Sequence, residues 1–118
     1  MTDLHQQTCQ PCHANAQPVA DKDVPALLAQ LPDWHIEPRD GISQLEKAYA
    51  FRDFASALAF TNTIGALAQE QDHHPALLTE WGRVTVTWWT HAINGLHSND
   101  FILAARTEAL AQHASGRQ

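Results

Sequence analysis

The sequence contains little cysteine, little positive charge and no long apolar segment. Seven Lys and Arg against thirteen Asp and Glu give a formal net charge of −6. That balance argues against a general nucleic-acid binder, which would carry a basic stripe. No apolar run approaches the roughly 18 residues that a membrane-spanning helix needs. The N-terminus has neither a basic region nor an apolar region typical of a secretory signal, so we expect a cytoplasmic protein with reduced thiols.

The remaining composition is that of a folded chain. Its 118 residues are 44% hydrophobic and 17% charged, which suits one domain with one sizeable core. The first twenty residues are polar and carry Pro11 and Pro18, which is typical of a mobile arm. We therefore predict an arm over 1–20 and a single domain over 21–114.

Both cysteines lie in that arm, in the string CQPCH at 9–13. Cys9, Cys12 and His13 match the local pattern of covalent haem attachment, and C-x-x-C is also half of a redox or metal site. The missing export signal weighs against haem, and no second C-x-x-C supplies the further ligands that zinc needs. Haem, metal or redox chemistry and an inert arm remain the alternatives, and the inert arm is favoured.

Periodicity predicts seven elements in the domain. Apolar residues at three- and four-residue steps predict helices, and alternation with β-branched and aromatic residues predicts strands. Asp23 and Ser98 are expected N-caps, and the face of Val84, Val86 and Trp88 is expected in the core. Helices are expected at 21–31, 52–71 and from 98 to about 113, and strands at 34–37, 42–51, 76–80 and 83–91. The order α-β-β-α-β-β-α predicts an α+β fold, a four-stranded antiparallel sheet with three helices on one face.

Three of the eight histidines fall where these elements end. His73 and His74 follow the second long helix, and Pro75 favours extended backbone at His74. His91 is expected to end the last strand, and Asp100 to begin the last helix. Imidazoles titrate near neutrality, so such a cluster suits acid–base chemistry. A zinc site made of these four residues is the chemical alternative, and adjacent histidines that splay apart argue against it.

The same stretch resembles the pterin-4a-carbinolamine dehydratase family. The resemblance rests on HHP at 73–75, the Trp81-Gly82 turn, TWWTHAINGL at 87–96 and NDFILAAR at 99–106, and it extends over about residues 22–112. It implies a four-stranded antiparallel sheet with helices on one side, and a homodimer or homotetramer. The implied activity is dehydration of 4a-hydroxytetrahydropterin to quinonoid dihydropterin, which recycles the cofactor of aromatic amino acid hydroxylases, with no metal or organic cofactor.

Residue roles follow from the resemblance. His73 and His91 are expected to donate protons to the 4a-hydroxyl, His74 to hold the pterin ring, and Asp100 to fix a histidine tautomer. Trp34 is expected to pack against the pterin.

One position departs from the family pattern. Where the family often has an acidic residue four positions before the first histidine, this chain has Gln69. Glu70 or Asp72 would have to replace that carboxylate, and Glu70 is therefore a candidate substrate-binding residue. The remaining tryptophans, Trp81, Trp88 and Trp89, are expected in core, turn or interface packing.

A second class of function stays open at this point. The chain could be a non-catalytic partner that regulates a hydroxylase or a transcription factor through its sheet or helix surface. No nucleic-acid or membrane partner is expected.

Overall fold

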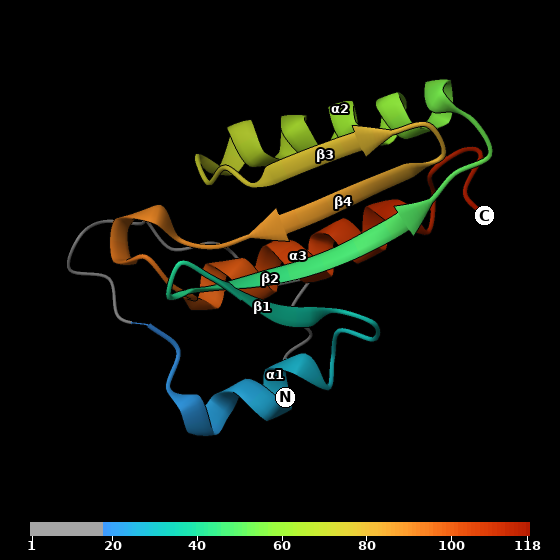
Figure 1. Cartoon of the computed structure of the whole chain (residues 1–118). Coiled ribbons are helices and arrows are strands. Elements are labelled where there is room, and N and C mark those ends of the chain that lie inside the picture. Colours follow the sequence, from blue (N-terminus) through green and yellow to red (C-terminus); the bar gives the residue numbers. More distant parts are fainter. Residues whose placement is uncertain (1–17) are drawn as a thin grey trace.

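A computed structural model describes residues 18–118 of the chain. It has the α+β fold predicted from the sequence, with strands and helices in the predicted order (Figure 1). The elements are η2 (Asp21–Asp23), α1 (Val24–Leu28), β1 (His35–Arg39), β2 (Ile42–Ala50), α2 (Phe54–Gln71), β3 (Ala76–Glu80), β4 (Arg83–Trp88), η3 (His91–Ile93) and α3 (Ser98–Ala111).

The four strands form one antiparallel sheet in the order β1-β2-β4-β3. Two tight hairpins build it. Asp40 and Gly41, at φ of 53° and 78°, join β1 to β2, and this left-handed pair matches the twist of the flanking strands. Trp81 and Gly82 join β3 to β4, with Gly82 at φ 77°. The long strands β2 and β4 are therefore central, and β1 and β3 are the edges.

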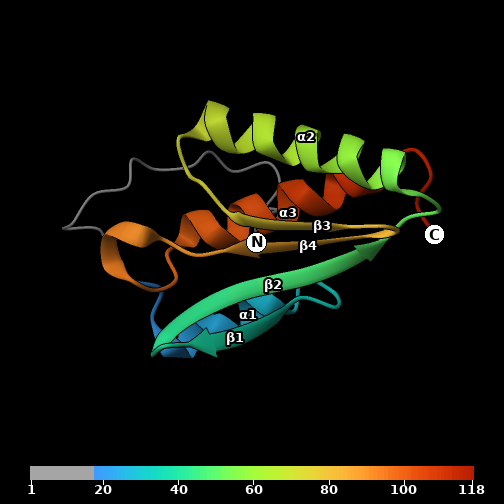
Figure 2. The same ribbon diagram turned by 45° about the horizontal axis from the view of Figure 1, so that its top comes forward.

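One face of the sheet carries the core. The helices α2 and α3 lie together over this face, and α1 lies beside β1 (Figure 2). Val84, Val86 and Trp88 are each 0% exposed, which confirms the face predicted for them. Their partners across the sheet, among them Leu45 and Tyr49, are equally buried. Residues of odd number in β2 thus face the helices, and those of even number face the opposite, open side.

The long helix α2 has clear start and stop signals. Asp53 is its N-cap and accepts a hydrogen bond from the backbone N–H of Ser56 at 2.8 Å. Hydrogen bonds from the backbone and the side chain of Ser56 lower the pKa of Asp53 below its ordinary value. The helix ends at Gln71 because Asp72 adopts the left-handed conformation, with φ 50°. This ending sets the direction of the chain at the two histidines.

The first helix is shorter than predicted. The single helix expected over 21–31 is a 3-10 turn, η2, followed by α1, which ends at Leu28. Asp23, the expected N-cap, makes no side-chain capping bond. Its backbone is already helical, at φ −91° and ψ −16°, and a carboxylate caps from the extended conformation.

Two predictions near the end of the chain were also wrong. The last strand ends at Trp88, and His91 begins η3 instead of ending the strand, because Thr90 pairs with Gly95 and turns the chain back. The N-cap of α3 is His97, and Ser98 is the first helical residue. His97 is the N-cap because its Nδ1 accepts a hydrogen bond from the N–H of Asn99 at 3.0 Å.

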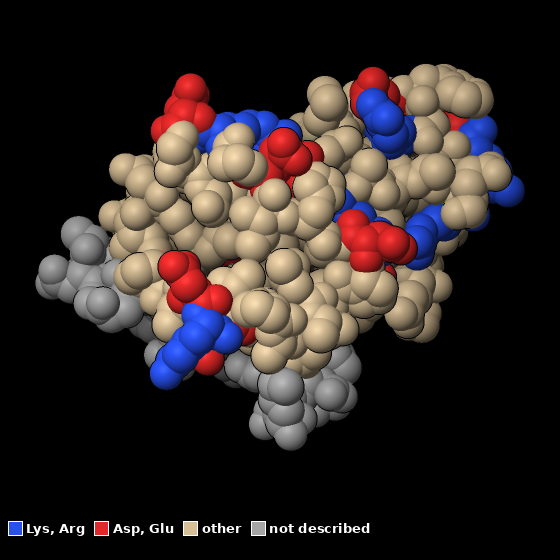
Figure 3. Space-filling view, turned by 60° about the horizontal axis from the view of Figure 1, so that its bottom comes forward, with Lys and Arg blue, Asp and Glu red and all other residues tan. Residues whose placement is uncertain are grey.

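Charges of opposite sign are interspersed over the molecule. Figure 3 shows one face, on which Lys and Arg neighbour Asp and Glu rather than gathering in a continuous basic patch among the described residues. Ion pairs of the described residues include Arg39–Glu46 and Arg83–Glu80. Within 18–118, none of the helices has both the length and the apolar character required to cross a bilayer.

Most of the predicted arm, including Cys9, Cys12 and His13, lies outside the described residues. Val19, which the prediction placed in the arm, packs against the core and donates its N–H to the carbonyl of Leu96 at 2.9 Å.

Candidate active site

His73 is a buried histidine at the end of α2. The left-handed Asp72 turns the chain, and the N–H of His73 still bonds the carbonyl of Ala68 at 3.1 Å. The imidazole is carried inward, where the residue is 5% exposed and its ring centre lies 5.9 Å from that of Trp88. Its Nε2 lies 2.7 Å from Oδ1 of Asp100. The histidine is thus held between an aromatic ring and a carboxylate.

Asp100 is the buried carboxylate in the first turn of α3, at 0% exposure. Its Oδ2 accepts two further hydrogen bonds, from the hydroxyl of Thr90 at 2.7 Å and from the N–H of His97 at 2.9 Å. The second bond closes the capping box of the helix. With both oxygens held, Asp100 fixes the orientation of His73, since a carboxylate accepts a hydrogen from Nε2.

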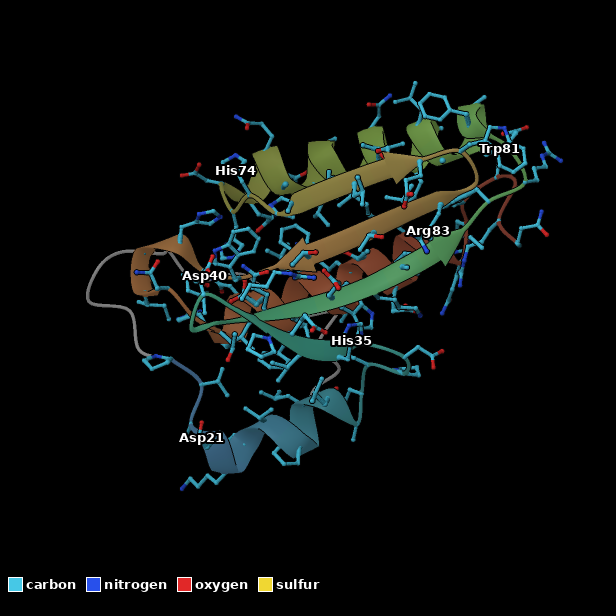
Figure 4. The ribbon with its side chains drawn as sticks, in the orientation of Figure 1. Asp21, His35, Asp40, His74, Trp81 and Arg83 are labelled. Carbon is cyan, nitrogen blue, oxygen red and sulfur yellow. The ribbon has the colours of Figure 1, made fainter. Side chains whose placement is uncertain are left out.

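His74, by contrast, is exposed, and it lies at the turn between α2 and β3 (Figure 4). Its Nε2 lies 3.1 Å from Oε1 of Gln69, one turn back on α2. An amide oxygen only accepts, so this contact places a hydrogen on Nε2. Gln69, where an acidic residue was expected, therefore makes a hydrogen bond to the site without adding a charge.

His91 closes the group from the other side. It is exposed, and its Nε2 donates to the backbone carbonyl of His74 at 3.3 Å. Its ring stacks on Trp89, with centres 4.5 Å apart and planes at 29°. The turn after α2, the start of η3 and the first turn of α3 thus meet, linked through His73, His74, His91 and Asp100.

Two predicted substrate-binding residues lie outside this group. Trp34 is 6% exposed and donates its indole N–H to Glu108 at 3.2 Å, in the core. Glu70 is exposed on α2, where its carboxylate accepts from Gln71 at 3.5 Å. Trp81 is 73% exposed and lies at the opposite end of β3 from His74 (Figure 4).

Sequence reasoning missed Thr90 and His97. Thr90 is polar at a position that continues the core-facing alternation of Val84, Val86 and Trp88, and it is 1% exposed. A polar residue in that register needs a buried partner, and this was the available signal. His97 gave none, because Ser98 beside it is the commoner capping residue.

The zinc alternative at these residues does not match the geometry. Within 18–118, only one set of three or more candidate ligand atoms gathers closely enough for a metal ion, and it consists of His35, Glu37 and Glu46. At the site, Nε2 of His73 faces Asp100 and Nε2 of His91 faces a carbonyl. The arrangement therefore suits proton transfer and hydrogen bonding by imidazoles.

A family model for pterin 4 alpha carbinolamine dehydratase matches residues 17–110. The chain belongs to this family. The dehydratase family motif, as read from the sequence, falls on His73, His74, His91 and Asp100, which are the residues that the fold brings together.

Solved structures of similar proteins agree with the family. A crystal structure of a transcriptional coactivator/pterin dehydratase from Brucella melitensis has 28% sequence identity and a TM-score of 0.71, covering 80% of this chain and 98% of that one. A pterin dehydratase-like protein identified as a RuBisCO assembly factor in the alpha-carboxysome is also 28% identical, with a TM-score of 0.55 over 66% of this chain and 88% of that one. Proteins similar to this chain thus include a transcriptional coactivator/pterin dehydratase and a RuBisCO assembly factor.

Proposed function

We propose that this member of the dehydratase family converts 4a-hydroxytetrahydropterin to quinonoid dihydropterin. One observation carries the proposal: His73 is bound to the buried Asp100 at 2.7 Å, next to the exposed His74 and His91. The group combines one buried imidazole whose orientation is fixed with two imidazoles that are exposed to solvent.

The reaction needs two proton movements and no redox change. A proton is delivered to the departing 4a-hydroxyl, and one is removed from N5, whose lone pair drives the loss of water. Imidazoles have unperturbed pKa values nearest neutrality and can serve both steps, each positioned group contributing about 10²–10⁴-fold. In this proposal His73 and His91 are the proton donors, and His74 orients the ring. Asp100 positions His73 by fixing its tautomer.

The remaining parts of the proposal concern the setting. The enzyme acts in the cytoplasm as a homodimer or homotetramer of the 21–114 domain, and recycles the pterin of aromatic amino acid hydroxylases. It needs no metal or organic cofactor. Trp34 and Glu70 stay predictions as substrate-binding residues.

A dehydratase assay on the full chain, with and without chelator, tests the reaction. We expect acceleration of quinonoid dihydropterin formation in both conditions, and its loss in the double variant His73→Ala/His91→Ala. His113→Ala is the matched control, since His113 is exposed in the turn after α3 and distant in sequence from the motif. Full activity in the double variant would refute the assigned roles.

A non-catalytic partner role is the second candidate. It is favoured by the two similar structures, since one is of a transcriptional coactivator/pterin dehydratase and the other is of a RuBisCO assembly factor. A stoichiometric protein that co-purifies with the chain, together with no dehydratase activity above the uncatalysed rate, would select this role over the first.

A further inference from the structure

A cluster of ligand-type side chains lies on the open face of the sheet, away from the histidines of the candidate active site. His35 and Glu37 are two residues apart on the edge strand β1, so both point to the same face. Ile36 between them packs toward the core, which places the pair on the face without helices. Glu46 of β2 is the cross-strand partner of His35. Figure 4 shows His35 on β1, far from His74.

The ligand atoms of these three residues converge. Nε2 of His35 lies 3.4 Å from Oε2 of Glu37 and 3.6 Å from Oε2 of Glu46, and all three ligand atoms are within 4.8 Å of one another. A tetrahedral zinc ion with bonds of about 2.1 Å places its ligand atoms about 3.4 Å apart. The two strands therefore hold the side chains close to the spacing that zinc requires.

Glu46 is the most buried member of the set. Its side chain is 14% exposed, against 53% for His35 and 46% for Glu37. The hydroxyl of Thr87 donates to Oε1 of Glu46 at 2.7 Å, and Arg39 contacts both carboxylate oxygens, at 2.9 and 3.1 Å. Such outer hydrogen bonds orient metal-binding carboxylates. Each carboxylate oxygen has two lone pairs, so Glu46 can keep Thr87 and share its charge between Arg39 and a metal ion.

We propose that His35, Glu37 and Glu46 form a binding site for a divalent transition-metal ion of the zinc type. One imidazole nitrogen and two carboxylate oxygens form the ligand set, and the fourth position is open to solvent, as in sites that exchange a bound water. The site lies at the β1 edge, whereas His73 and His74 lie between α2 and β3 at the other edge. It is independent of the proposed dehydratase activity, which requires no metal.

Zinc titration of the full chain by calorimetry tests the site, with Cys9→Ser/Cys12→Ser in every sample so that no thiolate competes. We expect one equivalent of Zn²⁺ to bind, and the ring ¹⁵N signals of His35 to shift in NMR spectra. Glu37→Gln and His35→Gln should each weaken binding at least about tenfold, because each removes one of three protein ligands.

Two controls make the result decisive. His113→Gln removes an exposed histidine elsewhere and should leave the affinity unchanged. Glu37→Gln replaces a half-exposed side chain, so its thermal unfolding should match that of the parent. Equal zinc affinity in Glu37→Gln and the parent, or shifts confined to other histidines, would overturn the proposal and leave the cluster as an ion-pair network.

Discussion

Two carboxylates on α3, the buried Asp100 and the partly buried Glu108, have different surroundings. Asp100 and Glu108 are eight residues apart, about 12 Å along the helix. Asp100 binds the imidazole of His73, the hydroxyl of Thr90 and a backbone N–H. Glu108 is bound by the ammonium of Lys47, by the hydroxyl of Tyr49 at 2.5 Å and by the indole of Trp34 at 3.2 Å.

The groups bonded to Asp100 and to Glu108 give the two carboxylates different roles. Burial would raise the pKa of Glu108, but hydrogen bonds from Lys47, Tyr49 and Trp34 outweigh it and lower the pKa. Burial, followed by the hydrogen bond to Glu108, raises the pKa of Tyr49 far above its ordinary value. Among residues 18–118, the groups bonded to Glu108 are an ammonium and a phenol, whose ordinary pKa values lie well above neutrality, and an indole, so this network suits structure alone. Asp100 instead holds an imidazole beside two exposed ones, and this neighbourhood makes it a candidate for catalysis.

The substitution Asp100→Asn should have the largest effect on activity. The amide oxygen can still accept from Thr90 and His97, which leaves the NH₂ group facing Nε2 of His73. His73 must then carry its hydrogen on Nδ1, the opposite tautomer. We expect dehydratase kcat/KM to fall about 10²-fold or more, the range of a lost acid–base group. Unchanged activity in a folded Asp100→Asn variant would remove Asp100 from the mechanism.

Glu108→Gln should have the opposite effect to Asp100→Asn. It should lower the stability of the fold and leave the dehydratase activity unchanged. Lys47 loses its counter-charge, so we expect the unfolding free energy in denaturant titrations to fall by about 1–3 kcal/mol. Because the folded pKa of Glu108 lies below its ordinary 4.5, its contribution is present above that pH and is lost as pH falls through the folded pKa. The difference between wild type and variant should therefore shrink below about pH 4.5. A matching loss of kcat per folded molecule would contradict the distinction between the two acids.

A pair of threonines gives a finer comparison. Thr90 donates to Asp100, whereas Thr107 accepts from Trp88 and donates to the carbonyl of Leu103. Valine at either position keeps the shape and removes the hydroxyl, with an expected cost of about 1 kcal/mol in thermal or denaturant unfolding. Only Thr90→Val should also lower activity, by about tenfold, because it loosens Asp100. Equal activities in the two variants would mean that the Thr90 bond is structural.

More of the fold than of the hydrogen bonds in the candidate site could be predicted from the sequence. Alternation over 83–88 and the apolar spacing in α2 identified the sheet face and the main helix, because burial imposes those periods directly. The motif selected His73, His74, His91 and Asp100, and the fold brings all four together. The register of Thr90 indicated a buried partner, but the identity of that partner and the bond of His97 to Asp100 could not be predicted, since they depend on where β4 ends and on a backbone turn at Gly95. The core location of Trp34 depends in the same way on the long-range contact with Glu108.

The smallest expected effect concerns Gln69, which bonds His74 at 3.1 Å where an acidic residue was expected. Gln69→Glu places a carboxylate on Nε2 and favours the protonated imidazole, so the NMR titration midpoint of His74 should move to higher pH. Both groups are exposed, so solvent screening limits the gain to about 0.2–1 kcal/mol.

The difference in stability between Gln69→Glu and wild type should also depend on pH. A histidine whose folded form holds its proton more tightly stabilises the fold at low pH, and the gain is lost as pH rises through the folded midpoint. Gln69→Glu should therefore gain stability relative to wild type as pH falls through the His74 midpoint, whereas above that midpoint only the cost of a carboxylate in the last turn of α2 should remain. Gln71→Glu adds the same charge two residues along α2 and should move the His74 midpoint less. Equal shifts in the two variants would show that net charge, not the 3.1 Å contact, acts on His74.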